Sequence, residues 1–320
     1  KRKGLSYMTS KEEFEKLSYK GKNVYSEISG GQREEMEKLC SDYRVFMDSS
    51  KTERECVEYS VDALEKSGFK PLETYSALKP GDKVYVVNRG KNIAAFVIGA
   101  DGIENGINIV GAHIDSPRLD LKQNPLYESD GIALLKTHYY GGIKKYQWTA
   151  IPLALHGVVY TADGGMKTVC IGEKEDDPVF CVTDLLPHLA TEQMQKKMHL
   201  AVEGEDLNII FGGIPVKDEE IKEGVKYNIL KLLNSAYGMT EKDFINAEFE
   251  IVPAFKAREV GLDRAFIGAY GHDDRVCAYT ALRAVLDIKD IPRKTACCLL
   301  VDKEEIGSCG NTGMLSQFYP

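Results

Sequence analysis

The sequence predicts an α/β fold that is interrupted by a long β-rich insertion. Two short apolar runs, residues 107–111 and 295–301, have the continuous hydrophobicity of strands buried within a sheet. Apolar residues at helical spacing follow Thr52 and occur again over residues 274–287. Residues 117–253 have a different sequence pattern, in which glycine pairs separate short β-like stretches. We therefore expect an α/β unit in two sequence segments, with a mostly β unit between them.

The first part of the chain is charged, and we expect two helices in it. Residues 32–47 suit the first helix. Thr52 is followed three residues later by Glu55, which is the pattern of a helix-capping box. Apolar residues then recur at helical spacing until Gly68, which predicts a second helix that ends there.

Three β-rich runs follow these helices. Residues 83–88 and 93–98 are separated by turn-forming residues and predict a hairpin. The run at 107–111 predicts a buried central strand that leads to His113, and the later run at 295–301 leads to Asp302. Ligands bind outside the carboxyl ends of strands in open α/β sheets, so we expect a functional site where these two strands end.

Composition narrows the class of protein. Apolar residues make up 43% and charged residues 28% of the chain, as in ordinary globular proteins. The net charge of −8 argues against a nucleic-acid partner, because phosphate binding needs a basic surface. No apolar run approaches the roughly 18 residues of a membrane span, and the eight scattered cysteines fit a reducing compartment, so we expect a cytoplasmic protein.

The first chemical cluster is His113 with Asp115, at the end of the first buried strand. Residues two apart in an extended chain point the same way, so the carboxylate could hold the imidazole in one tautomer, as metal-bound histidines require. The plainer alternative is a His and an Asp that merely solvate a loop.

Two acidic clusters follow in the second α/β segment. Asp273 and Asp274 precede a helix, where they could hold metal, or could simply cap the helix and favour its dipole. Glu304 and Glu305 follow the second buried strand; neighbours in an extended segment point apart, so one could bind metal while the other acts as general base. The alternative for this pair is a charged surface loop.

The three clusters together resemble the aspartyl aminopeptidase and vacuolar aminopeptidase I family of metallopeptidases. The resemblance rests on AHIDSP at residues 112–117, HDD at 272–274 and DKEEIGS at 302–308, with a looser likeness at YGGI (140–143) and LPHL (186–189). It implies a three-layer α/β/α metallopeptidase-type domain with a mixed, largely parallel sheet. That catalytic domain would comprise residues 1–116 and 254–320, with an inserted β-rich assembly domain at 117–253.

The resemblance also implies roles for individual residues. His113 would bind one metal ion and Asp115 would orient it. Asp273 would bridge two ions, Glu305 would bind the second, and Glu304 would be the general base. The implied cofactors are two divalent ions, zinc in the first place with cobalt or manganese as alternatives. The implied substrates are peptides with a free N-terminus, cleaved by an aminopeptidase through a metal-activated water.

Assembly and completeness are further expectations from the resemblance. It implies dimers that form a dodecamer, in which Trp148 and Ile151 would be interface residues, although a place in the core is the plainer interpretation. The family uses two more ligands, an acid and a His, which residues 306–320 lack, so we expect them beyond Pro320. We also predict a cis peptide between Asp273 and Asp274, because a bridging ligand at a tight turn needs an unusual backbone.

Two other functions stay open at this point. A deacylase or carboxypeptidase with two metals would share all three clusters. A non-catalytic assembly protein would explain the missing downstream ligands.

Overall fold

The structure is a computed structural model that describes residues 9–162 and 164–318. The chain divides into two compact units, Lys1–Tyr43 and Arg44–Pro320. In the first unit, helix α1 (Ser10–Leu17) begins with a capping box in which Thr9 and Glu12 bond each other's backbone N–H groups. Helix α2 (Gly30–Ser49) begins in this unit and ends in the second, and it confirms the helix predicted over residues 32–47.

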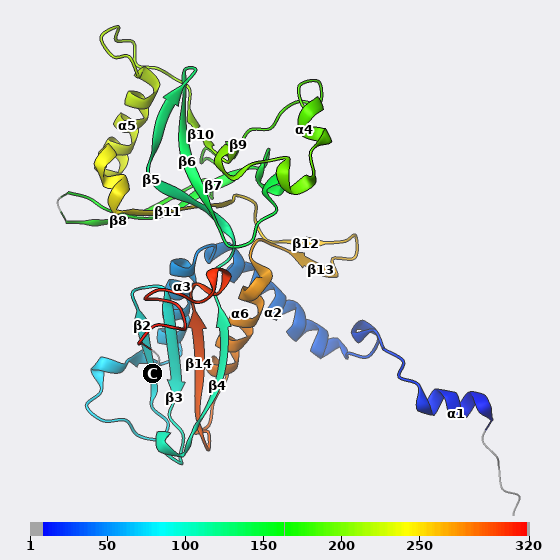
Figure 1. Cartoon of the computed structure of the whole chain (residues 1–320). Coiled ribbons are helices and arrows are strands. Elements are labelled where there is room, and N and C mark those ends of the chain that lie inside the picture. The colour runs from blue at the N-terminus through cyan, green and yellow to red at the C-terminus, as the bar shows by residue number, and fades with distance from the viewer. Residues whose placement is uncertain (1–8, 163, 319–320) are drawn as a thin grey trace, which may run out of the picture. The chain divides into compact units, whose positions relative to one another are not determined.

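In the second unit, the end of α2 is followed by helix α3 (Glu53–Lys66; Figure 1). Its capping box is formed by Thr52 and Glu55, as the sequence predicted. A five-stranded sheet follows in the order β1-β2-β3-β14-β4. Its strands are β1 (Lys70–Pro71), β2 (Lys83–Asn88), β3 (Asn92–Val97), β14 (Thr295–Val301) and β4 (Ile107–His113).

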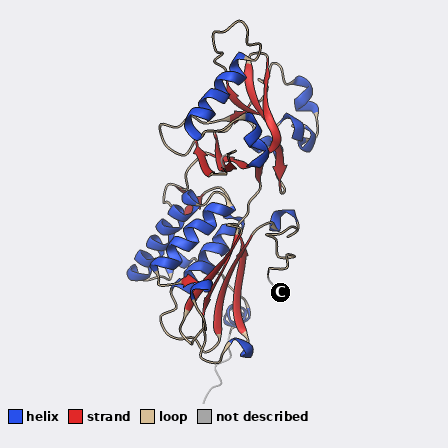
Figure 2. Cartoon of the chain, turned by 90° about the vertical axis from the view of Figure 1, so that its left-hand side faces the viewer, coloured by secondary structure: helices blue, strands red, loops and turns tan. Residues whose placement is uncertain are grey.

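This sheet is mixed, as expected. Strand β1 is parallel to β2 and β14 is parallel to β4, whereas β2–β3 and β3–β14 are antiparallel. The pairing of β2 with β3 confirms the predicted hairpin. Helices α3 and α6 (His272–Leu286) pack against the same face of the sheet (Figure 2).

Strand β4 departs from the prediction of a buried central strand. Within the residues that the structure describes, β4 pairs only with β14 and forms an edge of the sheet. Ile109 is 60% and Val110 is 53% exposed. The continuous apolar run does form a strand, but its place in the sheet depends on its partners rather than on its own residues. Strand β14, with β3 on one side and β4 on the other, is largely buried as predicted.

A seven-stranded antiparallel sheet occupies the middle of the chain, in the order β8-β7-β11-β5-β6-β10-β9. Its strands are β5 (Arg118–Ser129), β6 (Ile132–Tyr140), β7 (Leu153–Tyr160), β8 (Met166–Ile171), β9 (Cys181–Val182), β10 (Ile209–Gly212) and β11 (Ala247–Pro253). The described strands of this sheet all fall within the predicted insertion, residues 117–253, and those of the first sheet fall outside it. The domain boundaries themselves stay a prediction.

The core of this second sheet includes two strands that are buried along most of their length, β7 and β11, and one strand, β6, in which buried and more exposed positions largely alternate. Leu119, Leu135 and Ile251 are fully buried in it, and Trp148 is 7% exposed within the same cluster. Ile151 is partly buried against that cluster. Trp148 is therefore a core residue in this chain rather than an exposed interface group.

The remaining elements are short or peripheral. Helix α5 (Gly224–Tyr237) packs against β6, β5 and β10. Helix α4 (Thr191–Gln195) and the hairpin of β12 (Arg258–Val260) and β13 (Phe266–Gly268) complete the described elements of regular α or β structure. None of the helices in residues 9–162 and 164–318 is both long and apolar enough to cross a membrane.

Candidate metal centre

The parallel pairing of β4 and β14 brings two chemical clusters to one edge of the five-stranded sheet. His113, the last residue of β4, is directly opposite Val301, the last residue of β14. The Ile114 N–H donates to the Val301 carbonyl at 2.8 Å, so the two chains stay together beyond the sheet. The residues that follow each strand, Asp115 and Glu304, are therefore close in space although 189 positions separate them in sequence.

His113 lies at the centre of this cluster. Its Nε2 is 3.3 Å from Oδ1 of Asp273 and 3.7 Å from Oε2 of Glu304. Its Nδ1 is 3.0 Å from the Asp115 carbonyl oxygen and 3.3 Å from Asp115 Oδ1. A ligand atom from each of His113, Glu304 and Glu305 falls within 4.8 Å of the other two. The structure thus brings together the five residues that the sequence singled out.

Asp115 is the fully buried residue that supports the cluster. Oδ1 accepts the N–H of Glu304 at 3.2 Å, and Oδ2 accepts the N–H of Glu305 at 3.1 Å. One carboxylate therefore contacts the His113 ring and also fixes the backbone of both glutamates. Burial opposes the charge of Asp115, but hydrogen bonds from His113 and Tyr140 outweigh it and lower the pKa of Asp115.

The two glutamates lie on a tight turn rather than on the extended segment that the sequence suggested. Lys303 has a φ of 70°, and Glu304–Ile306 form a single 3-10 turn that ends at Gly307. Both glutamates consequently reach the same side, towards His113, instead of pointing apart. Asp302, by contrast, is fully buried and accepts the Thr312 hydroxyl at 2.6 Å, which makes it part of the supporting structure.

Asp273 reaches the cluster from the start of α6. The peptide between Asp273 and Asp274 is cis, as predicted, and the Ser116 hydroxyl donates to the Asp273 carbonyl at 3.1 Å. The Asp273 side chain is 89% and the Glu304 side chain 57% exposed. The cluster therefore presents its carboxylates to solvent above a buried floor.

The electrostatics of this cluster suit a divalent cation. Burial disfavours a charged imidazole, but the hydrogen bond and charge of Asp115 raise the pKa of His113 to about 9. Burial raises the pKa of Glu305, and the carboxylates around it add to that rise, although His113 opposes it. Several acids thus repel one another around one imidazole, and a cation between them would relieve that repulsion. Imidazole with carboxylates is a donor set that suits zinc, so the residues present fit the metal that the sequence implied.

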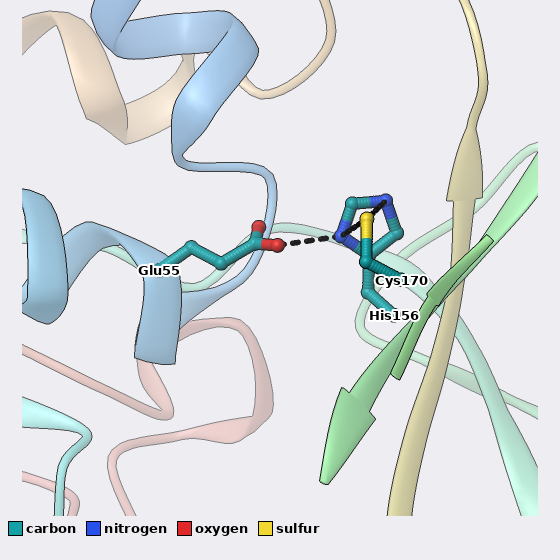
Figure 3. Close-up of side chains that lie close together, drawn as sticks. All are labelled: Glu55, His156 and Cys170. Carbon is teal, nitrogen blue, oxygen red and sulfur yellow. Dashed lines mark hydrogen bonds and ion pairs between the residues drawn. The ribbon is translucent and has the colours of Figure 1, made fainter. Parts of the chain in front are cut away.

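A second cluster of possible ligands contains Glu55, His156 and Cys170 (Figure 3). The Nδ1 of His156 is 2.6 Å from Glu55 Oε1, and its Nε2 is 3.1 Å from Glu173 Oε1. Cys170 Sγ is 4.0 Å from both ring nitrogens. Two carboxylates on two ring nitrogens require both nitrogens to donate, which describes an imidazolium ion pair rather than a metal ligand. Burial opposes this charge, but the hydrogen bonds around the ring raise the pKa of His156 to about 11.

Tyr140 is a residue at the metal centre to which the sequence gave no role. Its hydroxyl donates to Asp115 Oδ2 at 2.7 Å. Tyr140 lies in the YGGI segment at residues 140–143. Its contact with Asp115 depends on the pairing of β6 with β5, which the sequence does not show.

Comparison with known proteins places the chain among peptidases. The sequence profile described as "Aminopeptidase I zinc metalloprotease (M18)" matches residues 46–320. A Clostridium acetobutylicum protein named "Probable M18 family aminopeptidase 1" is 53% identical over 302 residues, covering 93% of this chain and 65% of that protein. The crystal structure of an M18-family aminopeptidase from Thermotoga maritima matches with a TM-score of 0.89 and 52% identity, over 94% of this chain and 65% of that one.

A more distant structure shares the fold. It is the structure of the yeast mApe1 dodecamer, which matches with a TM-score of 0.67 and 22% identity over 87% of this chain and 64% of that one. The chain therefore spans a little less than two thirds of the length of these relatives.

Proposed function

The chain belongs to the M18 family of zinc metalloproteases, and from that membership we propose that the protein is an aminopeptidase, which removes the N-terminal residue from peptides with the help of two divalent metal ions. The observation that carries this proposal is the convergence on His113. Its Nε2 faces the carboxylates of Asp273 and Glu304, while Asp115 holds the other side of the ring.

Each residue of the cluster has a proposed role. His113 and Glu305 would each hold one ion, and Asp273 would bridge the two. Zinc is the metal that this donor set favours, with cobalt and manganese as alternatives. When bound, the ions lower the pKa of a water molecule and polarise the carbonyl of the scissile bond.

The protein's own residues would move the proton and hold the geometry. Glu304 is exposed at the mouth of the cluster, where its carboxylate can accept a proton from the attacking water and return it to the leaving amine. When a metal takes the place of the Nε2 proton, Asp115 would keep Nδ1–H of His113 in place, so that Nε2 faces the metal.

The experiment that tests this proposal compares substrates with and without a free α-amine. The zinc-loaded protein is assayed on aminoacyl-nitroanilides and on their N-acetylated versions, and bound metal is counted by elemental analysis. An aminopeptidase hydrolyses only the free-amine series. Equal hydrolysis of both series would instead support a deacylase or another dinuclear hydrolase. Bound zinc without hydrolysis of either series would support a non-catalytic assembly protein.

We also propose that the protein forms a homo-oligomer through the segment that follows β9. Five large apolar side chains there are between 54% and 72% exposed: Leu185, Leu186, Leu189, Met194 and Met198. Large exposed apolar side chains that are concentrated in one segment are characteristic of subunit interfaces. Light scattering of the wild-type protein and of Leu189→Lys measures this directly, and a lower mass for the variant is expected.

The β-rich residues 117–253 form the proposed insertion between the two catalytic segments, and their sheet carries that apolar segment.

All eight cysteines are free, which supports a reducing compartment such as the cytoplasm.

A further inference from the structure

The seven-stranded sheet contributes one side chain to the support of the metal centre. Tyr140 is the last residue of β6 and is 7% exposed. Its hydroxyl donates to Asp115 Oδ2 at 2.7 Å, which makes it the shortest hydrogen bond that the Asp115 carboxylate receives. We infer that Tyr140 is a positioning residue for the metal centre, acting through Asp115. This inference rests on the proposed function, because it assigns Tyr140 a part in the same site.

The hydrogen-bond count at Asp115 shows why Tyr140 matters. Oδ1 contacts His113 Nδ1 and the N–H of Glu304. Oδ2 receives the N–H of Glu305 and the Tyr140 hydroxyl. The first three donors belong to the segments that carry the proposed metal ligands and base. Tyr140 is the donor that lies outside these segments. It therefore fixes the Asp115 carboxylate, and the carboxylate in turn aligns His113, Glu304 and Glu305.

Loss of this hydroxyl would leave Oδ2 with one donor, although the Asp115 side chain is fully buried. A buried carboxylate that loses a charge-assisted hydrogen bond can regain it only by moving. Any rotation of Asp115 changes the position of His113 and of the Glu304–Glu305 turn at the same time. The expected consequence is a weaker and less ordered metal centre, although no ligand has changed.

Tyr140 is itself rigidly held. Its ring lies under the guanidinium of Arg118, with 4.0 Å between the guanidinium carbon and the ring centroid. Arg118 is 4% exposed and pairs with Glu53 and Glu250, each at 3.2 Å. Arg118 and Tyr140 are also direct partners in the pairing of β5 with β6. The phenol is thus fixed from the ring face and from the backbone.

The residue after Tyr140 approaches the metal centre as well. Gly141 has a φ of 71°, and a Cβ placed on it would lie 3.1 Å from the Cβ of Glu305. The end of β6 therefore packs directly beside a proposed ligand. The Tyr140 hydroxyl itself is bonded to buried Asp115.

The test uses Tyr140→Phe, which removes one oxygen and keeps the ring under Arg118. Zinc affinity is measured by competition with a chromogenic chelator, and kcat and KM are measured separately on an aminoacyl-nitroanilide. We expect zinc affinity to fall about 10- to 100-fold, as for other losses of support behind a metal ligand. We expect kcat to fall with it and KM to stay near the wild-type value. The matched control is Tyr160→Phe, at the end of β7 in the same sheet, where the side chain is 48% exposed and wild-type zinc affinity is expected.

A double-mutant cycle separates positioning through Asp115 from a general effect on folding. Tyr140→Phe is combined with Asp115→Asn, and zinc affinity is compared in the four proteins. If Tyr140 acts through Asp115, its loss costs less in the Asp115→Asn background. Additive costs, or wild-type zinc affinity in Tyr140→Phe, would overturn the inference. Failure of the proposed function would give a different result, in which wild-type protein binds zinc but cleaves no free-amine substrate. The ratios of zinc affinity among the four proteins would still decide the role of Tyr140.

Discussion

Glu304 and Glu305 are neighbours in sequence, yet their surroundings separate their proposed tasks. The backbone N–H of each glutamate donates to one oxygen of Asp115, so the backbone of both residues is held in the same way. The Glu304 side chain is largely exposed, whereas Glu305 packs beside Gly141 and burial raises its pKa. An exposed carboxylate can exchange protons with water during each cycle, and a partly buried one is better suited to hold a metal.

The division of roles predicts the effect of Glu304→Gln. The amide keeps the shape of the side chain but cannot accept a proton, so kcat should fall by about 10²- to 10⁴-fold. Zinc affinity should change little, because the ligand at Glu305 and the backbone of the turn are kept. Isothermal titration with zinc and steady-state kinetics on the same preparation measure the two effects. A variant that loses zinc and activity together would instead make Glu304 a ligand.

At the level of elements, the start of α6 depends on Gly271. Its φ is 83°, and a Cβ there would lie 2.0 Å from Nη1 of Arg275 and 2.9 Å from the hydroxyl of Ser116. Arg275 is 1% exposed and donates to the Lys51 carbonyl at 2.6 Å, so it cannot move aside easily. The glycine therefore permits the tight entry that places Asp273 beside His113.

Gly271→Ala should lower the free energy of unfolding by about 1–3 kcal/mol, through backbone strain and the clash with Arg275. Urea denaturation of the metal-free protein measures this. Gly131→Ala is an informative control, because Gly131 also has a positive φ, 74°, but a Cβ there would meet no atom within 4 Å. Equal losses in both variants would show that the φ angle alone, and not the clash, sets the cost.

Sequence patterns predicted those elements whose signals are local. The capping box at Thr52 and Glu55 gave the start of α3, and the apolar run at 295–301 gave β14. The edge position of β4 was missed, because an apolar run reports burial and not the order of strands. The 3-10 turn after Lys303 was missed too, since a positive φ at a lysine has no sequence signature.

At the candidate site too, local sequence signals were predictive and contacts between distant elements were not. The five candidate residues could be named in advance, because acids and a His at strand ends and before a helix are visible in the sequence, and the family resemblance selected among them. Tyr140 could not be assigned a role, because its contact with Asp115 depends on how a strand of the second sheet ends against the first. Its resemblance motif at residues 140–143 marked the segment without saying what it does.

At the scale of the whole second unit, buried ion pairs join α3 to the seven-stranded sheet. One group centres on His156, which bonds Glu55 of α3 and Glu173 after β8, while Lys51 contacts Glu173 at 2.6 Å. The other centres on Arg118 and Glu53. Folding shifts the pKa values of groups in both sets, so the stability of the unit depends on pH.

The His156 group predicts a loss of stability at alkaline pH. Its pKa is raised from 6.5 to about 11 in the folded protein, so folding takes up a proton between these values. The stabilisation is complete below pH 6.5 and is lost as the pH rises towards 11, with a slope of at most about 1.4 kcal/mol per pH unit. Facing groups are Glu55, Glu173, Cys170 and, through Glu173, the ammonium groups of Lys51 and Lys256.

Urea unfolding of wild-type protein and His156→Gln from pH 7 to pH 10 checks this sign. The difference in unfolding free energy between the two proteins should be largest at pH 7 and should shrink as the pH rises. A difference that stays constant over this range would mean that His156 is neutral when folded.

The Arg118 group contains two buried carboxylates with opposite expected states. Arg118 and Lys91 outweigh burial and lower the pKa of Glu53, so it stays ionised. Burial dominates at Glu250 and raises its pKa well above the usual range, although Arg118 opposes this. Glu250 Oε1 contacts Arg118, and its Oε2 is buried without a hydrogen-bond partner among the described residues.

Replacing each acid by its amide should therefore have unequal effects. Glu53→Gln leaves the charges of Arg118 and Lys91 without their main buried partner, and breaking such a pair costs about 3–5 kcal/mol of unfolding free energy. Glu250→Gln replaces a neutral group by another of the same shape and should cost less than about 1 kcal/mol. Parallel urea titrations at pH 7 measure the two costs. A large loss in Glu250→Gln as well would show that Glu53 and Glu250 are both ionised next to Arg118.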